Sequence, residues 1–318
     1  MTIGIPRKAF LSERVWPIVR VLLLQLLLWM GIVGNLVGWL LLALLVDQLH
    51  WLKIDFHGKT LDTISPDGKV IGFVVLFTVN LVLVVLAWRL MERKPLRAML
   101  WEFSRKQRRT LAWGLLAGLG EVLLVFGVMT ALGAARSTWG LAAVPSKTIL
   151  MAFGWILASS ILGPIVEEVL NRGYWFQNIK RGWGVVAAAI VTALLFGGAH
   201  LLNPNAEILG VINIALSAIT YVLGLVWLRS LWFPIGWHAA WNFAQFFIVG
   251  LPNSGISVSS MGLDGTTLLV TTTSGPTWLT GGGFGMEASV IRTIILFGII
   301  AAMFWFKQRR AQPSASAA

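Results

Sequence analysis

The sequence contains no cysteine and few charged residues. Of its 318 residues, 12% are charged and 57% are hydrophobic, whereas an ordinary soluble domain carries about 25% charged residues. The absence of cysteine excludes disulfides, thiolate metal ligands and cysteine catalysis. The scarcity of charge excludes an ordinary soluble enzyme, because so few charged side chains cannot solvate the two domains that this length would suggest. Lipid is therefore the expected solvent for much of the surface.

Tyrosine is also scarce, with two residues against 17 tryptophans. Tryptophan is enriched where membrane helices meet the lipid headgroups. The formal net charge of +12 would suggest nucleic acid in a soluble protein, but here most basic residues flank apolar segments. We therefore predict contacts with membrane lipids and no nucleic-acid partner.

Apolar runs of about 20 residues predict transmembrane helices, since the hydrocarbon core is about 30 Å thick and a helix rises about 1.5 Å per residue. The first run is too long for the apolar core of a signal peptide and no cleavage site follows it, so we expect it to stay as an anchor. The fold predicted is an all-α polytopic membrane protein. Its eight predicted spans lie near 17–46, 70–90, 111–134, 148–170, 184–203, 209–228, 231–250 and 289–306.

Lysine and arginine in the loops predict the orientation. Eighteen of them lie on the N-terminal side of the predicted spans, and five lie on the opposite side, at Lys53, Lys59, Lys69, Arg136 and Lys147. Both termini should therefore be cytoplasmic. The compact loops and the tryptophan-rich C-terminal half suggest a bacterial cell membrane.

Three connecting segments have distinct compositions. Residues 47–69 alternate apolar and polar side chains before a turn sequence, which predicts a small outer hairpin. Residues 91–109 are basic with interspersed apolar side chains, as in an interfacial amphipathic segment. Residues 251–288 contain no lysine or arginine and predict a long outer loop. We divide the chain into an N-terminal membrane region at 1–145, a membrane core at 146–306 and a disordered basic tail at 307–318.

Polar residues inside the predicted spans indicate a functional site. An ionisable residue there costs roughly 2.5–3.5 kcal/mol on insertion scales and is rarely present without a use. Two glutamates end the fourth run, one histidine lies late in the fifth, and a histidine and an asparagine lie one turn apart in the seventh. These residues are Glu167, Glu168, His200, His238 and Asn242.

The helical spacing predicts different surroundings for the two glutamates. Glu168 and Arg172 are four residues apart and share a helix face, where they can form an ion pair. Glu167 is rotated from Glu168 by about 100°, so it points elsewhere and is free for general acid–base work. His238 and Asn242, also four residues apart, should project into one cavity within the membrane.

These motifs resemble the CPBP family, which comprises intramembrane proteases related to the CaaX prenyl endopeptidase Rce1 and to bacterial Abi proteins. The family pattern appears here as Glu167-Glu168-x-x-x-Arg172, Phe196-x-x-x-His200 and His238-x-x-x-Asn242. Each fragment alone is weak, but their order on consecutive hydrophobic segments is specific. The resemblance covers about 150–250.

The resemblance implies an intramembrane endopeptidase that cleaves a membrane-associated protein or peptide. By position, Glu167 would activate water with help from His200, and His238 and Asn242 would bind the oxyanion. Glu168 and Arg172 would be supporting residues, and Phe196 would serve packing. We favour a site without a metal cofactor; the zinc alternative would use Glu167, His200 and His238 as ligands.

Two other functions remain open at this point. The same glutamates and histidines could form the proton or cation pathway of a transporter, or the protein could be a non-catalytic membrane scaffold. One geometric conflict also remains, because His200 lies late in an outward-going span whereas Glu167 lies near the cytoplasmic end of its own. Either the fourth span continues beyond Arg172 toward Lys180, or the boundaries of the 184–203 run are wrong.

Overall fold

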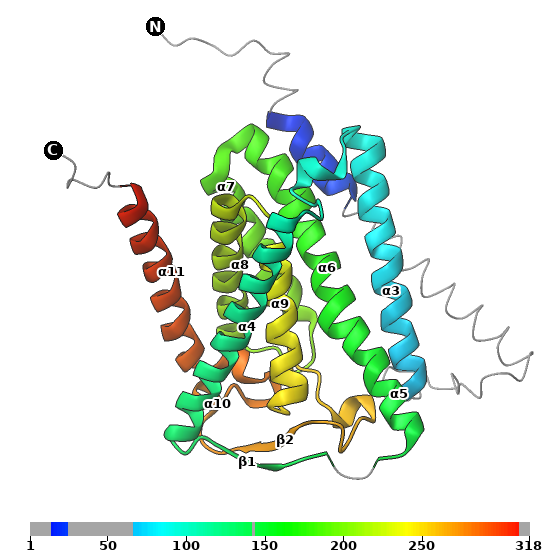
Figure 1. Cartoon of the computed structure of the whole chain (residues 1–318), viewed down its shortest axis with the longest axis vertical. Helices are drawn as coiled ribbons and strands as arrows, with labels where there is room; N and C mark the ends of the chain where they lie inside the picture. Colours follow the sequence, from blue (N-terminus) through cyan, green and yellow to red (C-terminus); the bar gives the residue numbers. More distant parts are fainter. Residues whose placement is uncertain (1–13, 25–65, 142–143, 312–318) are drawn as a thin grey trace, which may run out of the picture.

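The computed structural model describes residues 14–24, 66–141 and 144–311. These form a bundle of long helical segments that run between two ends of the molecule (Figure 1). Most of the first predicted span, most of the 47–69 hairpin and the end of the basic tail lie outside the described residues. The main helices are α3 (Pro66–Ala87), α4 (Arg105–Ala131), α5 (Ser146–Trp155), α6 (Gly163–Glu168), α7 (Phe176–Ala199), α8 (Ile208–Leu228), α9 (Trp232–Phe243) and α11 (Val290–Ala311).

The predicted all-α membrane architecture is confirmed. Within the described part of the chain, five helices are long and apolar enough to cross a membrane, judged by length and composition: Gly68–Glu92, Arg105–Ala131, Ser146–Leu202, Ile208–Leu228 and Val290–Arg309. The count is below eight because the first predicted span is largely undescribed, the fourth and fifth merge, and the seventh is short. This seventh segment consists of α9 and a π-helical continuation, η8 (Ala244–Ile248).

The merged helix resolves the conflict over the depth of the site. The fourth predicted span was wrong in ending at 170, because the helix continues through a π-helical segment, η6 (Val169–Trp175), into α7. Hydropathy suggested an end there because Asn171 and Arg172 are polar, yet both are buried inside the protein. The chain bends at Gly184, where φ is 82° and ψ is 174°. This backbone conformation is open to glycine without strain.

Helix α9 is held close to α4 by small residues. A Cβ atom at Gly114 would collide with the carbonyl oxygen of Phe233, and one at Gly118 would collide with that of Trp237. Small residues let helix backbones approach closely where lipid supplies no hydrophobic driving force. Helix α4, from the N-terminal region, therefore fixes the position of the helix that carries His238 and Asn242.

A buried polar network also connects α9 to α4 and α11. Glu121 Oε1 lies 3.1 Å from Arg292 Nε, and its Oε2 accepts a 2.6 Å hydrogen bond from Trp237 Nε1. The Arg292 guanidinium lies 3.6 Å from the centre of the Trp241 ring. Since an unpaired buried charge is costly, these contacts give the three helices a specific mutual register.

The segment 251–288 is more structured than a simple loop. Its strand β2 (Leu269–Thr273) pairs antiparallel with β1 (Ala135–Trp139), with Ala135 opposite Thr273. It also contains the short helix α10 (Thr277–Thr280). The backbone N–H of Leu268 donates to the Phe247 carbonyl at 2.8 Å, which fastens the segment beneath the end of α9 (Figure 1).

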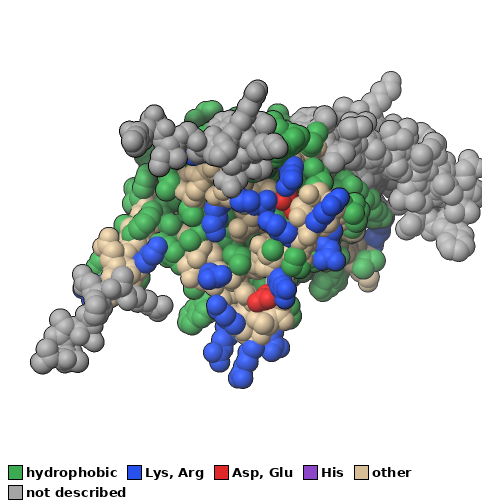
Figure 2. Space-filling model, turned by 90° about the horizontal axis from the view of Figure 1, so that it is seen from above, with side chains coloured by type: hydrophobic (Ala, Val, Ile, Leu, Met, Phe, Trp, Pro, Cys, Tyr) green, Lys and Arg blue, Asp and Glu red, His purple; other side chains and the backbone are tan. Residues whose placement is uncertain are grey.

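The basic segment 91–109 is folded against the bundle rather than laid out as one amphipathic face. A π-helical turn, η3 (Trp88–Glu92), is followed by a 3₁₀ turn, η4 (Leu96–Met99), and α4 begins only at Arg105. Pro95 interrupts the helical hydrogen bonds, and Met99 is completely buried. Figure 2 shows Lys and Arg side chains gathered on this end of the molecule.

We predict that this basic end faces the cytoplasm, because positively charged loops are retained there. Reporter fusions after Arg109 and after Arg310 should both read cytoplasmic, and a fusion within 251–288 should read extracytoplasmic. A cytoplasmic signal from 251–288 would show that the number of crossings between these fusions is wrong.

Candidate active site

The four residues expected to be catalytic line one cavity. Glu167, His200, His238 and Asn242 border a space of about 390 Å³ between α3, the run from α5 to α7, and α9. Much of the remaining wall is aromatic, with Phe73, Phe77, Trp155, Phe196 and Phe246. A few convergent polar groups in an apolar cavity are the usual form of a ligand or active site.

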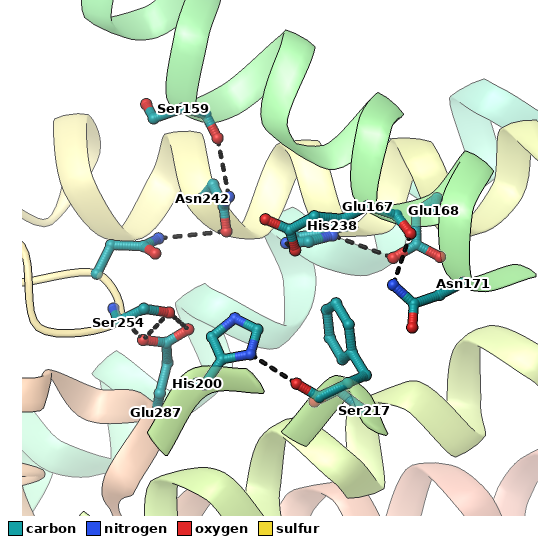
Figure 3. Close-up of polar contacts among 12 residues, drawn as sticks. Ser159, Glu167, Glu168, Asn171, His200, Ser217, His238, Asn242, Ser254 and Glu287 are labelled. Carbon is teal, nitrogen blue, oxygen red and sulfur yellow. Dashed lines mark hydrogen bonds and ion pairs between the residues drawn. The ribbon is translucent and has the colours of Figure 1, made fainter. Parts of the chain in front are cut away.

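A buried carboxylate organises the cavity wall. Glu168 Oε1 lies 3.1 Å from Arg172 Nη1, and both side chains are fully buried. The same oxygen lies 3.1 Å from His238 Nδ1 (Figure 3). The helical spacing predicted the contact with Arg172, whereas the contact with His238 joins two helices and was not foreseen. Because a carboxylate oxygen accepts hydrogen bonds, His238 Nδ1 must carry the hydrogen of this contact. Nε2 of the same ring is then available to other groups.

Aromatic rings enclose the Arg172 guanidinium. Its Cζ atom lies 4.5 Å from the centre of the Phe196 ring and 5.2 Å from that of Tyr221. Cation–π contacts of this kind help to offset the loss of hydration. Phe196 also lies edge-on to His200 and His238, with ring centroids 5.0 and 5.9 Å away. It separates the buried ion pair from the cavity, in agreement with the packing role expected from the sequence.

Glu167 points into the cavity instead. Its side chain is 33% exposed, and its Oε2 lies 3.9 Å from His238 Nε2. That oxygen has no hydrogen-bond partner among the described residues. The separation exceeds a direct hydrogen bond, and contacts of this length are often bridged by water. The two adjacent glutamates therefore have different surroundings: one is locked in an ion pair, and the other is open to a ligand.

His200 lies on the opposite wall, at the end of α7. Its Nδ1 is 2.7 Å from the carbonyl oxygen of Phe196. Because a carbonyl only accepts, Nδ1 must carry the hydrogen, and Nε2 of the neutral ring is an acceptor. The imidazole is thereby fixed in one tautomer.

Asn242 is held by two hydrogen bonds. Its Nδ2 donates to the Ser159 carbonyl at 2.9 Å, and its Oδ1 accepts from Asn253 Nδ2 at 3.3 Å. Ser159 belongs to a π-helical segment, η5 (Ile156–Leu162), and such segments are frequent at functional sites. These two partners could not be predicted from the sequence, because neither belongs to a motif and Asn253 comes from the outer segment.

The proposed zinc ligands do not form a metal site in this arrangement. Among the residues that the structure describes, no group of three or more His, Cys, Asp or Glu side chains is placed to hold a metal ion. Glu168 is occupied by Arg172 and His238.

Part of the chain matches a known protein family. Residues 149–244 match the family model described as type II CAAX prenyl endopeptidase Rce1-like. The matched segment contains the two glutamates, both histidines, Arg172 and Asn242, and the predicted resemblance is confirmed for it. The family suggests CAAX-type intramembrane protease activity. A search of curated proteins found no match.

The different surroundings of the two glutamates predict different effects on stability. Glu168→Gln leaves the buried Arg172 without its counter-charge, and breaking a buried pair costs about 3–5 kcal/mol. Glu167→Gln, the same chemical change one residue earlier, should leave the free energy of unfolding nearly unchanged. Thermal unfolding of both variants in detergent compares them directly, and equal melting temperatures would contradict the account of the ion pair.

Proposed function

We propose that this protein, with its Rce1-like segment, is an intramembrane endopeptidase that hydrolyses a peptide bond of a membrane-associated protein or peptide. The observation that carries the proposal is the placement of Glu167, His200, His238 and Asn242 around one apolar cavity. Peptide hydrolysis requires a base that deprotonates the attacking water and an acid that protonates the leaving amine. It also requires hydrogen-bond donors that stabilise the oxyanion. These four side chains supply all three requirements.

Glu167 is the base in this proposal. A water molecule between its Oε2 and the substrate carbonyl loses a proton to the carboxylate as the oxygen attacks the carbonyl carbon. His200 Nε2 accepts the second hydrogen of the same water and orients its lone pair, because Nδ1 is already committed to Phe196. As the C–N bond breaks, the carboxyl of Glu167 returns its proton to the leaving amine nitrogen.

His238 and Asn242 receive the negative charge that develops on the carbonyl oxygen. With Nδ1 bonded to Glu168, His238 donates to the oxyanion from Nε2, which requires a hydrogen on both ring nitrogens. Asn242 uses one N–H for Ser159 and has the second for the oxyanion. Glu168 and Arg172 act through His238 as positioning residues. The donors are fixed before the reaction, which is the arrangement that stabilises a transition state best.

Loss of the base tests this assignment. Glu167→Gln keeps the size of the side chain but cannot take a proton, so turnover should fall by at least the ~100-fold typical of lost acid–base catalysis. Quantitative proteomics of membranes that contain wild type or Glu167→Gln should reveal the uncut precursor, and a peptide from it provides the assay in detergent. Near-normal turnover by a correctly folded Glu167→Gln would show that another group is the base. Solute transport in liposomes without cleavage would favour a transporter.

We further propose that the reaction uses no metal cofactor. Exhaustive chelation should then leave turnover unchanged, and the purified protein should contain substoichiometric metal. Asn242→Ala should lose roughly 100- to 1000-fold in turnover, as expected for one oxyanion donor. Stoichiometric zinc that is lost together with activity in His200→Ala would overturn the metal-free mechanism.

A further inference from the structure

The outer segment 251–288 supplies one wall of the cavity. Asn253, Ser254 and Ile256 all border it, although they lie outside the segment that matches the family model. Gly255 has a φ of 88°, and a Cβ atom there would collide with the Pro204 carbonyl. The backbone at this point is therefore packed directly against the turn that follows α7.

A buried carboxylate holds this wall in place. Glu287 is almost fully buried and accepts hydrogen bonds from the backbone N–H and the hydroxyl of Ser254. The Ser254 carbonyl accepts from Asn203 Nδ2 at 3.1 Å, and Gly255 N–H donates to the Phe284 carbonyl at 3.0 Å. Figure 3 shows Ser254 and Glu287 beside His200, at the side of the cavity facing away from Glu168. The wall is thus tied both to the turn that follows α7 and to the end of the segment.

The wall contacts the proposed oxyanion site at one point. Asn253 Nδ2 donates to Asn242 Oδ1 at 3.3 Å, while the opposite end of the Asn242 carboxamide donates to the Ser159 carbonyl. The two ends of a carboxamide have nearly the same shape but opposite hydrogen-bonding properties. A donor at one end and an acceptor at the other therefore fix which way the group faces.

We infer that Asn253 is a positioning residue that keeps the free N–H of Asn242 directed into the cavity, with Glu287 and Ser254 holding Asn253 in place. This inference rests on the proposed function of Asn242. The outer segment therefore contributes a positioning residue to the site, in addition to covering it.

Two substitutions distinguish a change in the orientation of the Asn242 carboxamide from the simple loss of its hydrogen bond with Asn253. Asn253→Ala removes the donor, and turnover should fall about five- to tenfold, the loss expected for one hydrogen bond. Asn253→Asp replaces the donor with a group that only accepts and draws the Asn242 N–H toward itself, so its loss should approach the ~100-fold expected for a missing oxyanion donor. In both variants KM should change little. Asp264→Asn, in the same segment but outside the cavity, is the control.

A double-mutant cycle tests whether Asn253 acts through Asn242. Residues that act as a unit give non-additive losses, so Asn253→Ala should cause no further decrease in turnover when Asn242 is already alanine. Additive losses, or an unchanged kcat in both Asn253→Ala and Asn253→Asp, would overturn the inference while leaving the proposed function intact. A normal turnover in Asn242→Ala would instead refute the oxyanion assignment.

A structure of Asn253→Asp provides a readout that does not depend on activity. The Asn242 carboxamide should turn so that its Nδ2 contacts the new carboxylate and no longer the Ser159 carbonyl. An unchanged contact between Asn242 and Ser159 would show that Asn253 does not set the orientation, whatever reaction the cavity performs.

Discussion

The cost of burying charge governs the arrangement of this site. Glu168 and Arg172 are both fully buried, and neither would be stable there alone. Their pairing fixes the carboxylate, the carboxylate fixes His238, and the histidine then presents Nε2 toward Glu167. One ion pair thus determines which glutamate is structural, which is available for chemistry, and which nitrogen of the histidine faces the cavity.

The rest of the bundle supports this arrangement from outside the matched segment. Helix α4 approaches α9 through Gly114 and Gly118, and the Glu121–Arg292 pair links both to α11. These contacts fix the height and rotation of α9, so that His238 and Asn242 face the same space. The N-terminal and C-terminal parts of the chain therefore both contribute to the geometry of the site, although neither carries a recognisable motif.

The sequence predicts those features that depend on local spacing. The i,i+4 spacing was enough to foresee the contact between Glu168 and Arg172, and apolar runs were enough to foresee a helical membrane protein. The continuation of the helix past Arg172 could be given only as one of two alternatives, because hydropathy cannot distinguish a polar residue buried with partners from one in a loop. Glu121, Asn253 and Glu287 were missed because their partners are distant in the chain. The pairing of β1 with β2 is likewise a long-range contact that spacing does not reveal.

The most direct test is a structure of the protein bound to a peptide that carries a tetrahedral transition-state analogue, such as a phosphonate, in place of the cleaved bond. One analogue oxygen should lie within hydrogen-bond distance of His238 Nε2 and Asn242 Nδ2, and a second should lie beside Glu167. An analogue bound outside this cavity, or one whose oxygens coordinate a metal ion held by His200 and His238, would contradict it.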